Sequence, residues 1–213
     1  MRTIKLHFLF ILLFCSTVIL LTASGETIET KNYIRTDNYT LYKNPDTGVV
    51  RSITNRKGKG ISDIKMKELL KHKEVVTIDL YGGYPFRNSL VQIISNFRML
   101  KGLSIKDGAI NDEGLKDIAK IKTLSSLSLN NMQITDKGVK YLEALENLEY
   151  IELQNTQITD TSFDVFYRLK KLSYLDLTGT NVSEKATQKF YDVRRKELPG
   201  HDVHIYITGK EFY

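Results

Sequence analysis

Cysteine, proline and tryptophan are scarce in this chain of 213 residues, which has one cysteine, Cys15, three prolines and no tryptophan. Cys15 lies within an apolar run at residues 8–21, which follows the basic stretch "MRTIKLH" and precedes the small residues of "TASG". That order predicts a secretory signal peptide over residues 1–25. Removal of this segment leaves no thiol, which excludes disulfides, a cysteine nucleophile and a thiolate metal site from the mature chain.

The apolar run spans 14 residues, whereas a membrane-spanning helix needs about 20. We therefore expect cleavage and export to a secreted, periplasmic or cell-surface location. The alternative is a retained signal anchor, and membrane contact is expected only through such an uncleaved N-terminal segment. Lipidation of Cys15 is not expected, because Phe14 occupies the preceding position, where that processing signal needs a small residue.

Charges of both signs are interspersed along the chain. There are 31 Lys and Arg against 25 Asp and Glu, a formal charge of +6, and Arg2 and Lys5 of the predicted signal segment account for two of the positive charges. A nucleic-acid-binding domain more often shows a clustered basic stripe. We therefore expect a solvated surface of mixed charge and no nucleic-acid partner.

Four similar phrases recur with starts 24 residues apart, at 103, 127, 151 and 175. They are "LSIKDGAINDEGLKDI", "LSLNNMQITDKGVKYL", "IELQNTQITDTSFDVF" and "LDLTGTNVSEKATQKF". Repetition at a fixed period of this size predicts stacked structural repeats. An earlier unit starts at Val75 and has one extra residue, so we expect five repeats over residues 75–198.

Each unit changes its apolar period partway through. Counting from Leu100, Leu124, Leu148 and Leu172, positions 1, 4 and 6 are apolar, and the alternation at positions 4 to 6 predicts a strand buried on one face. Apolar residues then recur every three, which predicts a short helix. Helix-capping side chains and acidic residues stand between the two patterns: Asn111, Thr135, Thr159 and Ser183, followed by Asp112, Asp136, Asp160 and Glu184.

The pattern LxxLxLxxxxITDxGLxxLxxLxx resembles the short bacterial type of leucine-rich repeat, a motif also found in the repeats of F-box proteins. The resemblance implies an α/β solenoid, with short parallel strands on a concave face and short helices on a convex face. Position 9, often Asn or Cys in this family, departs from the pattern at Gly108, Met132, Thr156 and Thr180, so an incomplete side-chain ladder is expected in the turns. Nothing before residue 75 resembles an F-box, and a ubiquitin-ligase role is not implied.

The flanking segments are expected to cap the solenoid. In the N-terminal cap region, 26–74, residues 39–54 predict a β-hairpin with "NPDTG" as its turn, and residues 62–72 predict an amphipathic helix. A break at Pro199-Gly200 precedes a capping strand within 199–213. Since exported repeat domains of animals and plants commonly have disulfide-bonded caps, the absence of cysteine favours a bacterial envelope or secreted protein. The sequons at Asn38 and Asn181 matter only in a host that glycosylates exported proteins.

The sequence offers little for catalysis. His201 and His204 would lie on opposite faces of a strand, Asp112, Asp136 and Asp160 fit helix capping better than calcium binding, and "YGGY" lacks the lysine and spacing of a phosphate loop. We therefore predict that the protein is not an enzyme and has no metal or cofactor.

Positions 3, 5 and 7 of each strand should project from the concave face. Its C-terminal half is the predicted protein-binding site: Tyr150, Glu152, Gln154, Tyr174, Asp176 and Thr178. We also expect the two acids to favour a cation between them. The alternative is that the tyrosines form only a stabilising cross-strand pair. A second candidate is the loop 81–88 with Tyr84, Phe86 and Arg87, whose aromatic residues would otherwise cover the first repeat.

These observations predict an exported, non-catalytic protein–protein interaction module. The partner is expected to be a protein, because concave solenoid faces commonly bind proteins. The alternative is a structural envelope component, or a constitutive subunit, that uses the repeat only as a scaffold.

Overall fold

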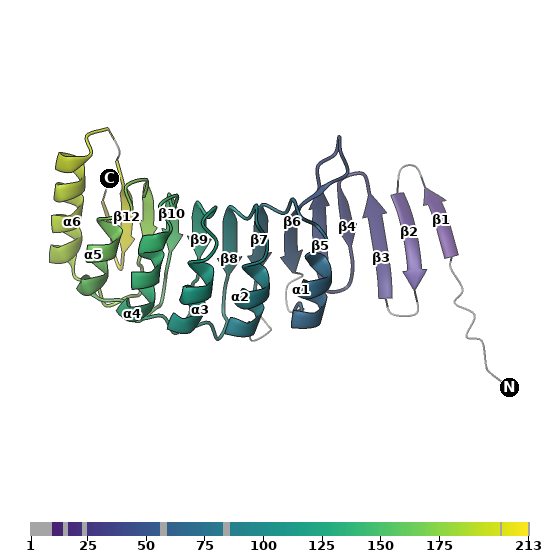
Figure 1. Cartoon of the computed structure of the whole chain (residues 1–213), viewed down its shortest axis with the longest axis horizontal. Helices are drawn as coiled ribbons and strands as arrows, with labels where there is room; N and C mark the ends of the chain where they lie inside the picture. The colour runs from purple at the N-terminus through teal and green to yellow at the C-terminus, as the bar shows by residue number, and fades with distance from the viewer. Residues whose placement is uncertain are drawn as a thin grey trace.

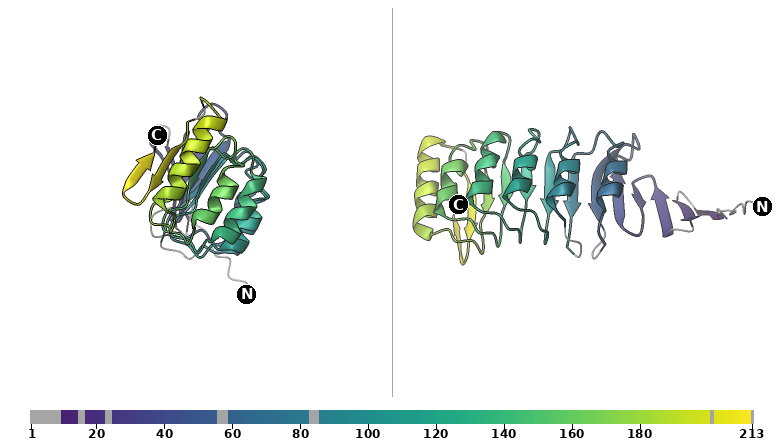
Figure 2. Two further views of the ribbon diagram at one scale, coloured as in Figure 1. Left: turned by 90° about the vertical axis from the view of Figure 1, so that its left-hand side faces the viewer. Right: turned by 60° about the horizontal axis from the view of Figure 1, so that its bottom comes forward.

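The computed structural model describes residues 10–14, 17–22, 25–55, 59–82, 86–200 and 202–212. In these residues the strands form one open sheet in which spatial order follows chain order from β1 to β13. The helices lie in a single layer on one face of this sheet (Figure 1; Figure 2). No helix of the described residues covers the opposite face, which we call the open face.

The five repeats supply the parallel central part of the sheet. Their strands pair side by side in register: β7 (Thr77–Leu80), β8 (Gly102–Ile105), β9 (Ser126–Ser128), β10 (Tyr150–Glu152) and β11 (Tyr174–Asp176). The helical segments that follow are α2 (Asn88–Ile94), α3 (Asp112–Ile118), α4 (Asp136–Val139) with the 3₁₀ helix η1 (Lys140–Ala144), the 3₁₀ helix η2 (Asp160–Ser162) with α5 (Phe163–Phe166), and α6 (Glu184–Glu197). The predicted α/β solenoid of parallel strands and short helices is therefore confirmed.

The core lies between the sheet and the helix layer. Every residue at positions 1, 4 and 6 of the five units is buried, as are Ile110, Ile134 and Ile158 at position 11. In the third repeat, the apolar spacing of three residues matches the period of the 3₁₀ helix η1, which continues α4. In the third repeat, Val139, Leu142 and Leu145 are all fully buried across that transition.

The turns after the strands contain a side-chain ladder, one position earlier than the family pattern led us to expect. Asp107, Asn131 and Asn155 have positive φ angles of 59°, 60° and 53°, a conformation that Asn and Asp tolerate better than most residues. The amide of Asn131 donates to Asp107 at 2.5 Å, and that of Asn155 donates to Asn131 at 2.8 Å. Gly179 continues the positive φ, and a Cβ there would lie 2.0 Å from the Asn155 Oδ1.

A second ladder joins the helix starts of successive repeats. Asn111, Thr135, Thr159 and Ser183 cap their own helices, as predicted. The aspartate after each of the first three caps does more than complement the helix dipole, because it binds the following repeat. The Asp112 carboxylate accepts from the Thr135 amide at 2.8 Å and from the Thr135 hydroxyl at 2.7 Å, and Asp136 binds Thr159 in the same way.

The N-terminal cap region continues the sheet with antiparallel strands. It contains β3 (Gly25–Thr30), β4 (Tyr33–Arg35) and the predicted hairpin of β5 (Tyr39–Lys43) and β6 (Val50–Asn55), and β6 pairs in parallel with β7. The predicted helix is α1 (Asp63–Leu69), which starts after its cap Ser62. Hairpin and helix are thus confirmed, and they join the repeats directly.

Part of the predicted signal segment also forms strands. β1 (Phe10–Phe14) and β2 (Thr17–Thr22) are antiparallel, and β2 pairs with β3. We expected this segment to lie outside the fold. The difference has a physical reason, since a run rich in Val, Ile, Leu and Thr has high β propensity and finds a pairing partner in β3. Cleavage near residue 25 stays a prediction. Among the described residues no helix has both the length and the apolar character to cross a bilayer.

The C-terminal cap contains two strands where we expected one. α6 is followed by β12 (His204–Ile207), parallel to β11, and by β13 (Lys210–Phe212), antiparallel to β12. As predicted, Ile205 and Ile207 are buried while His204 is exposed. Arg194 of α6 is 1% exposed and donates to the carbonyl oxygens of Leu169 at 3.0 Å and Leu172 at 2.7 Å. It therefore binds backbone acceptors at the end of the stack.

Candidate protein-binding surface

The parallel register aligns side chains of the open face into rows across the sheet. The middle row contains Thr54, Asp79, Ser104, Ser128, Glu152, Asp176 and Tyr206. The predicted site residues Glu152 and Asp176 are therefore neighbours in this row. Tyr206 of β12 extends the row, and the prediction missed it because the strand lies beyond the Pro199-Gly200 break and outside the 24-residue period. The available signal in the sequence was the alternation of Tyr206 with the apolar residues Ile205 and Ile207, which puts the tyrosine on the open face of the strand.

Three tyrosines stack on the open face at its C-terminal end, and we call Tyr150, Tyr174 and Tyr206 the tyrosine ladder. The ring centroids of Tyr150 and Tyr174 are 4.2 Å apart with an interplanar angle of 7°, and those of Tyr174 and Tyr206 are 5.2 Å apart at 37°. All three side chains are half-buried. The residue that pairs with Tyr150 on β9 is the small Ser126, so the row of stacked rings ends at Tyr150.

A hydrogen-bond network holds the base of the ladder. The Glu152 carboxylate accepts from the Tyr150 hydroxyl, from Ser128 Oγ at 2.7 Å and from Asn130 Nδ2 at 3.0 Å, and Lys106 Nζ lies 3.9 Å away. Burial alone would raise the pKa of Glu152, but these hydrogen bonds outweigh it and the pKa lies below its ordinary value. Burial, together with the bond to Glu152, raises the pKa of Tyr150.

The second acid of the site is also bonded within the chain. Asp176 is 6% exposed, and it accepts from Gln154 Nε2 at 2.5 Å and from the Thr178 amide at 2.9 Å. Because both carboxylates already have internal donors, the structure gives no reason to expect a cation between them. Four of the six predicted side chains, Tyr150, Glu152, Gln154 and Asp176, thus belong to two polar clusters, which are linked where the Gln154 backbone amide donates to Asn130 Oδ1 at 2.8 Å. Thr178 joins through its backbone amide, and Tyr174 through the stacking of its ring.

The second predicted site, in loop 81–88, is not brought together as an exposed cluster. Phe86 is 0% exposed and belongs to the core, in agreement with the alternative that the loop covers the first repeat. Arg87 is exposed at the start of α2, and Tyr84 lies outside the described residues. Phe86 is therefore withdrawn as a contact residue.

The described part of the chain holds no group of three His, Cys, Asp or Glu side chains near enough to share a metal ion.

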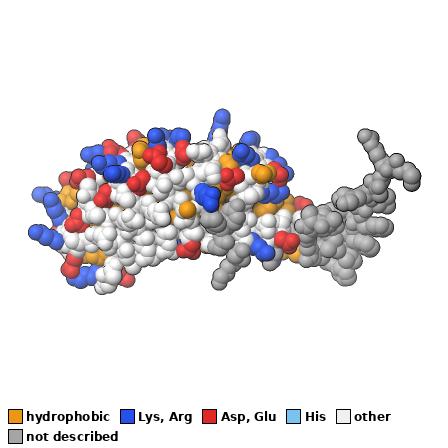
Figure 3. Space-filling view, turned by 90° about the horizontal axis from the view of Figure 1, so that it is seen from below, with side chains coloured by type: hydrophobic (Ala, Val, Ile, Leu, Met, Phe, Trp, Pro, Cys, Tyr) orange, Lys and Arg blue, Asp and Glu red, His pale blue; other side chains and the backbone are white. Residues whose placement is uncertain are grey.

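The turns between the strands and the helices form a largely uncharged edge of the molecule. Figure 3 looks onto the strand-to-helix turns and shows a largely uncharged band, with many Lys, Arg, Asp and Glu side chains along its upper margin.

Comparison with known proteins identifies the repeats. Residues 122–182 match the family described as "Leucine rich repeat". No curated protein sequence gives a significant match. Within residues 122–182 the chain therefore contains repeats of the leucine-rich type. This fold is consistent with a protein–protein interaction module, and such proteins are typically non-catalytic.

Solved structures share the fold at low sequence identity. A pollen receptor kinase 3 matches with a TM-score of 0.50 and 18% identity, covering 80% of this chain and 77% of its own. Internalin C2 of Listeria monocytogenes matches with a TM-score of 0.46 and 15% identity, covering 75% and 81%. A leucine-rich repeat protein of Leptospira interrogans has a TM-score of 0.43 and 20% identity, covering 65% and 38%.

Proposed function

We propose that this is an exported, non-catalytic leucine-rich repeat protein that binds a protein partner through the C-terminal half of its open face. The observation that carries the proposal is the tyrosine ladder, three half-buried aromatic rings stacked on strands that no described helix covers. Tyrosine is frequent among binding hot spots because it combines a large contact area with one polar group.

The surrounding network supports binding because it fixes the ladder in advance. The hydroxyl of Tyr150 is bonded to Glu152, and its ring is stacked on Tyr174. Side chains already held in place lose less conformational entropy when a partner binds. The outer edges of the rings would supply apolar contacts, while Gln154 and Thr178, both half-buried, lie beside them for polar contacts.

Export is the part of the proposal that depends on the sequence. The basic, apolar and small residues of segment 1–25 support it. N-terminal sequencing of the natural protein tests it directly. We expect the mature chain to begin near residue 24–26, and recovery of Met1 from a membrane fraction would replace secretion with a signal anchor.

A structural envelope component is the second candidate. It is favoured by the contact between Tyr150 and Tyr174, because rings stacked at 4.2 Å stabilise neighbouring strands whether or not a partner binds. In this reading the ladder contributes to the fold alone.

Alanine substitutions separate the two candidates. Tyr150→Ala and Tyr174→Ala should each weaken the retention of a co-purifying protein partner by about 2 kcal/mol or more, roughly thirtyfold, while the thermal midpoint changes little. Tyr81→Ala is the matched control, because Tyr81 follows the strand of the first repeat, at the opposite end of the repeats from the ladder, and is 41% exposed. Tyr150→Phe keeps the ring and removes the bond to Glu152.

Binding should be measured with each purified variant against the partner recovered by wild-type protein, next to a thermal melt of the same sample. Normal binding combined with early melting of the two alanine variants would favour the structural candidate. Equal loss in Tyr81→Ala would mean that the ladder has no special role.

A further inference from the structure

The stacking of repeats gathers basic residues that are dispersed in the sequence. The residue two places before each unit lies in the connection from a helix to the next strand, and these positions hold Lys73, Arg98, Lys122, Glu146 and Lys170. Because successive units stack, these side chains form one column along that edge. With Lys71 and Lys101, the first three members form a surface that we call the basic edge, and all five side chains are exposed.

The charges of the basic edge are poorly neutralised within the described chain. Lys73, Arg98 and Lys101 take part in none of its ion pairs, and Lys122 donates to the backbone carbonyl of Ala144 at 3.2 Å. The nearby acid Glu74 is paired with Arg51 at 3.2 Å. A net positive surface therefore extends over three successive connections.

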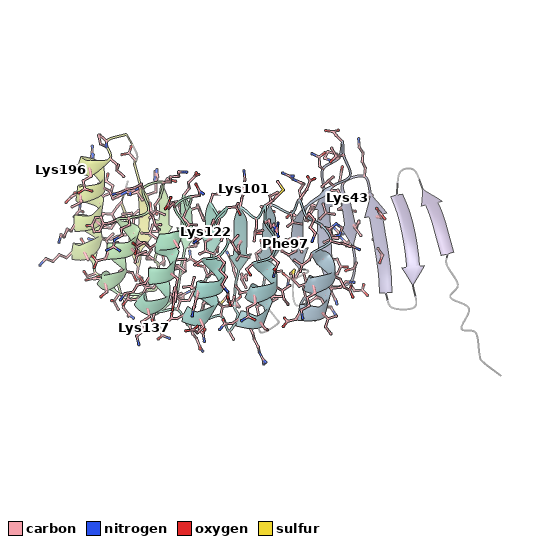
Figure 4. The ribbon with its side chains drawn as sticks, in the orientation of Figure 1. Lys43, Phe97, Lys101, Lys122, Lys137 and Lys196 are labelled. Carbon is pink, nitrogen blue, oxygen red and sulfur yellow. The ribbon has the colours of Figure 1, made fainter. Side chains whose placement is uncertain are left out.

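A cavity with both apolar and basic lining residues opens within this basic edge. It has a volume of about 670 Å³ and is lined by Leu70, Lys73, Asn96, Phe97, Arg98 and Met99. Met99 is 43% exposed, whereas Phe97 is 2% exposed, so Met99 presents most of the apolar surface that these two residues offer. Figure 4 labels Phe97, Lys101 and Lys122, which come from the connections that follow α2 and α3.

We propose that the basic edge docks a short acidic peptide segment of a protein partner, with one apolar side chain of the segment in the cavity. Leu70, Phe97 and Met99 would contact that side chain. Carboxylates on either side of it would pair with Lys73, Arg98 and Lys101. This surface shares no residue with the tyrosine ladder, so the proposal stands independently of the function proposed above.

The charge pattern along the edge favours a short peptide over an anionic membrane or a nucleic acid. The basic column ends at Glu146, and Glu149 lies beside it, so an extended anionic surface or polymer would meet like charge in the next repeat. Two strand spacings of about 4.8 Å separate the first connection from the third, a span of roughly 10 Å, or about three extended residues. A flat lipid surface would also leave the cavity unfilled.

The probe for the test is a fluorescein-labelled peptide of alternating Glu and Asp with one central Phe, titrated with the full chain and followed by fluorescence anisotropy. Lys73→Glu/Arg98→Glu should weaken binding at least about tenfold, because attraction becomes repulsion. Lys170→Glu/Lys196→Glu is the matched control, since it makes the same charge change at exposed residues beyond the acidic repeat and should bind as wild type does. Thermal melts of all variants verify the fold.

Two further arms test the apolar contact and the class of ligand. Replacing the Phe of the peptide by Ser, or making the protein variant Met99→Ser, should each weaken binding at least about fivefold. The result that overturns the proposal is any of four: no binding by wild type, equal loss in the control variant, no effect of removing the Phe, or tighter binding to phosphatidylglycerol-containing vesicles or single-stranded DNA than to the peptide.

Discussion

Asp136 is expected to be a major contributor to repeat stacking, although it is only half-buried. Its carboxylate accepts three hydrogen bonds from the next repeat, from the Thr159 amide at 3.0 Å, the Thr159 hydroxyl at 2.7 Å and the Ser162 hydroxyl at 2.5 Å. A hydrogen bond to a charged group contributes about 1.5–3 kcal/mol, and water replaces part of each bond at a half-exposed site. We therefore expect Asp136→Ala to lower the free energy of unfolding by about 2–4 kcal/mol.

That loss is large against the total stability of a typical domain, which is about 5–15 kcal/mol. It should be measured by urea titration, with far-UV circular dichroism and tyrosine fluorescence followed on the same samples so that partial unfolding of the stack is detected. Asp160→Ala is a graded comparison, because Asp160 is exposed and its carboxylate accepts two bonds from Ser183 among the described residues. Its effect should be smaller, about 1 kcal/mol.

Asp164→Ala is the control, because Asp164 is an exposed acid on the neighbouring α5 and its change should stay within about 0.5 kcal/mol. Equal effects of Asp136→Ala and Asp164→Ala would refute the reasoning. The bonds from Thr159 and Ser162 would then contribute nothing beyond what water supplies, and packing of the apolar faces alone would hold the repeats together.

Two further predictions concern the strands. Leu127→Ala removes a fully buried side chain and should lower the free energy of unfolding by about 2–5 kcal/mol, measured by urea titration. Gln154→Ala, which removes a side chain that donates to Asp176, should lower it by only about 1 kcal/mol. Equal losses would mean that the strand faces are wrongly assigned. Glu152 has a lowered pKa in the folded state, so its stabilisation is fully present above the unfolded pKa and is lost as the pH falls through the folded pKa. The stability difference between wild type and Glu152→Gln should therefore shrink between about pH 7 and about pH 3, and a constant difference would contradict the hydrogen-bond network.

The sequence by itself determined the repeating unit. Burial at positions such as Leu127 and Leu129, the helix caps at Thr135 and Thr159, and the three-residue spacing behind η1 could all be predicted, because each depends on residues a few places apart. Strand and helix periods act locally, and neither half of a unit can bury its apolar face unless the units stack.

Only the tertiary structure decided which side chains meet across the stack. The bonds of Asp136 to the next repeat, the addition of Tyr206 to the ladder and the internal bonding of Glu152 join residues from different strands or repeats. The same is true of the basic edge, whose members come from three successive helix-to-strand connections, and of the burial of Phe86 in the core. Such contacts depend on the register between units and on side-chain direction at their edges, and the period of one unit does not encode either.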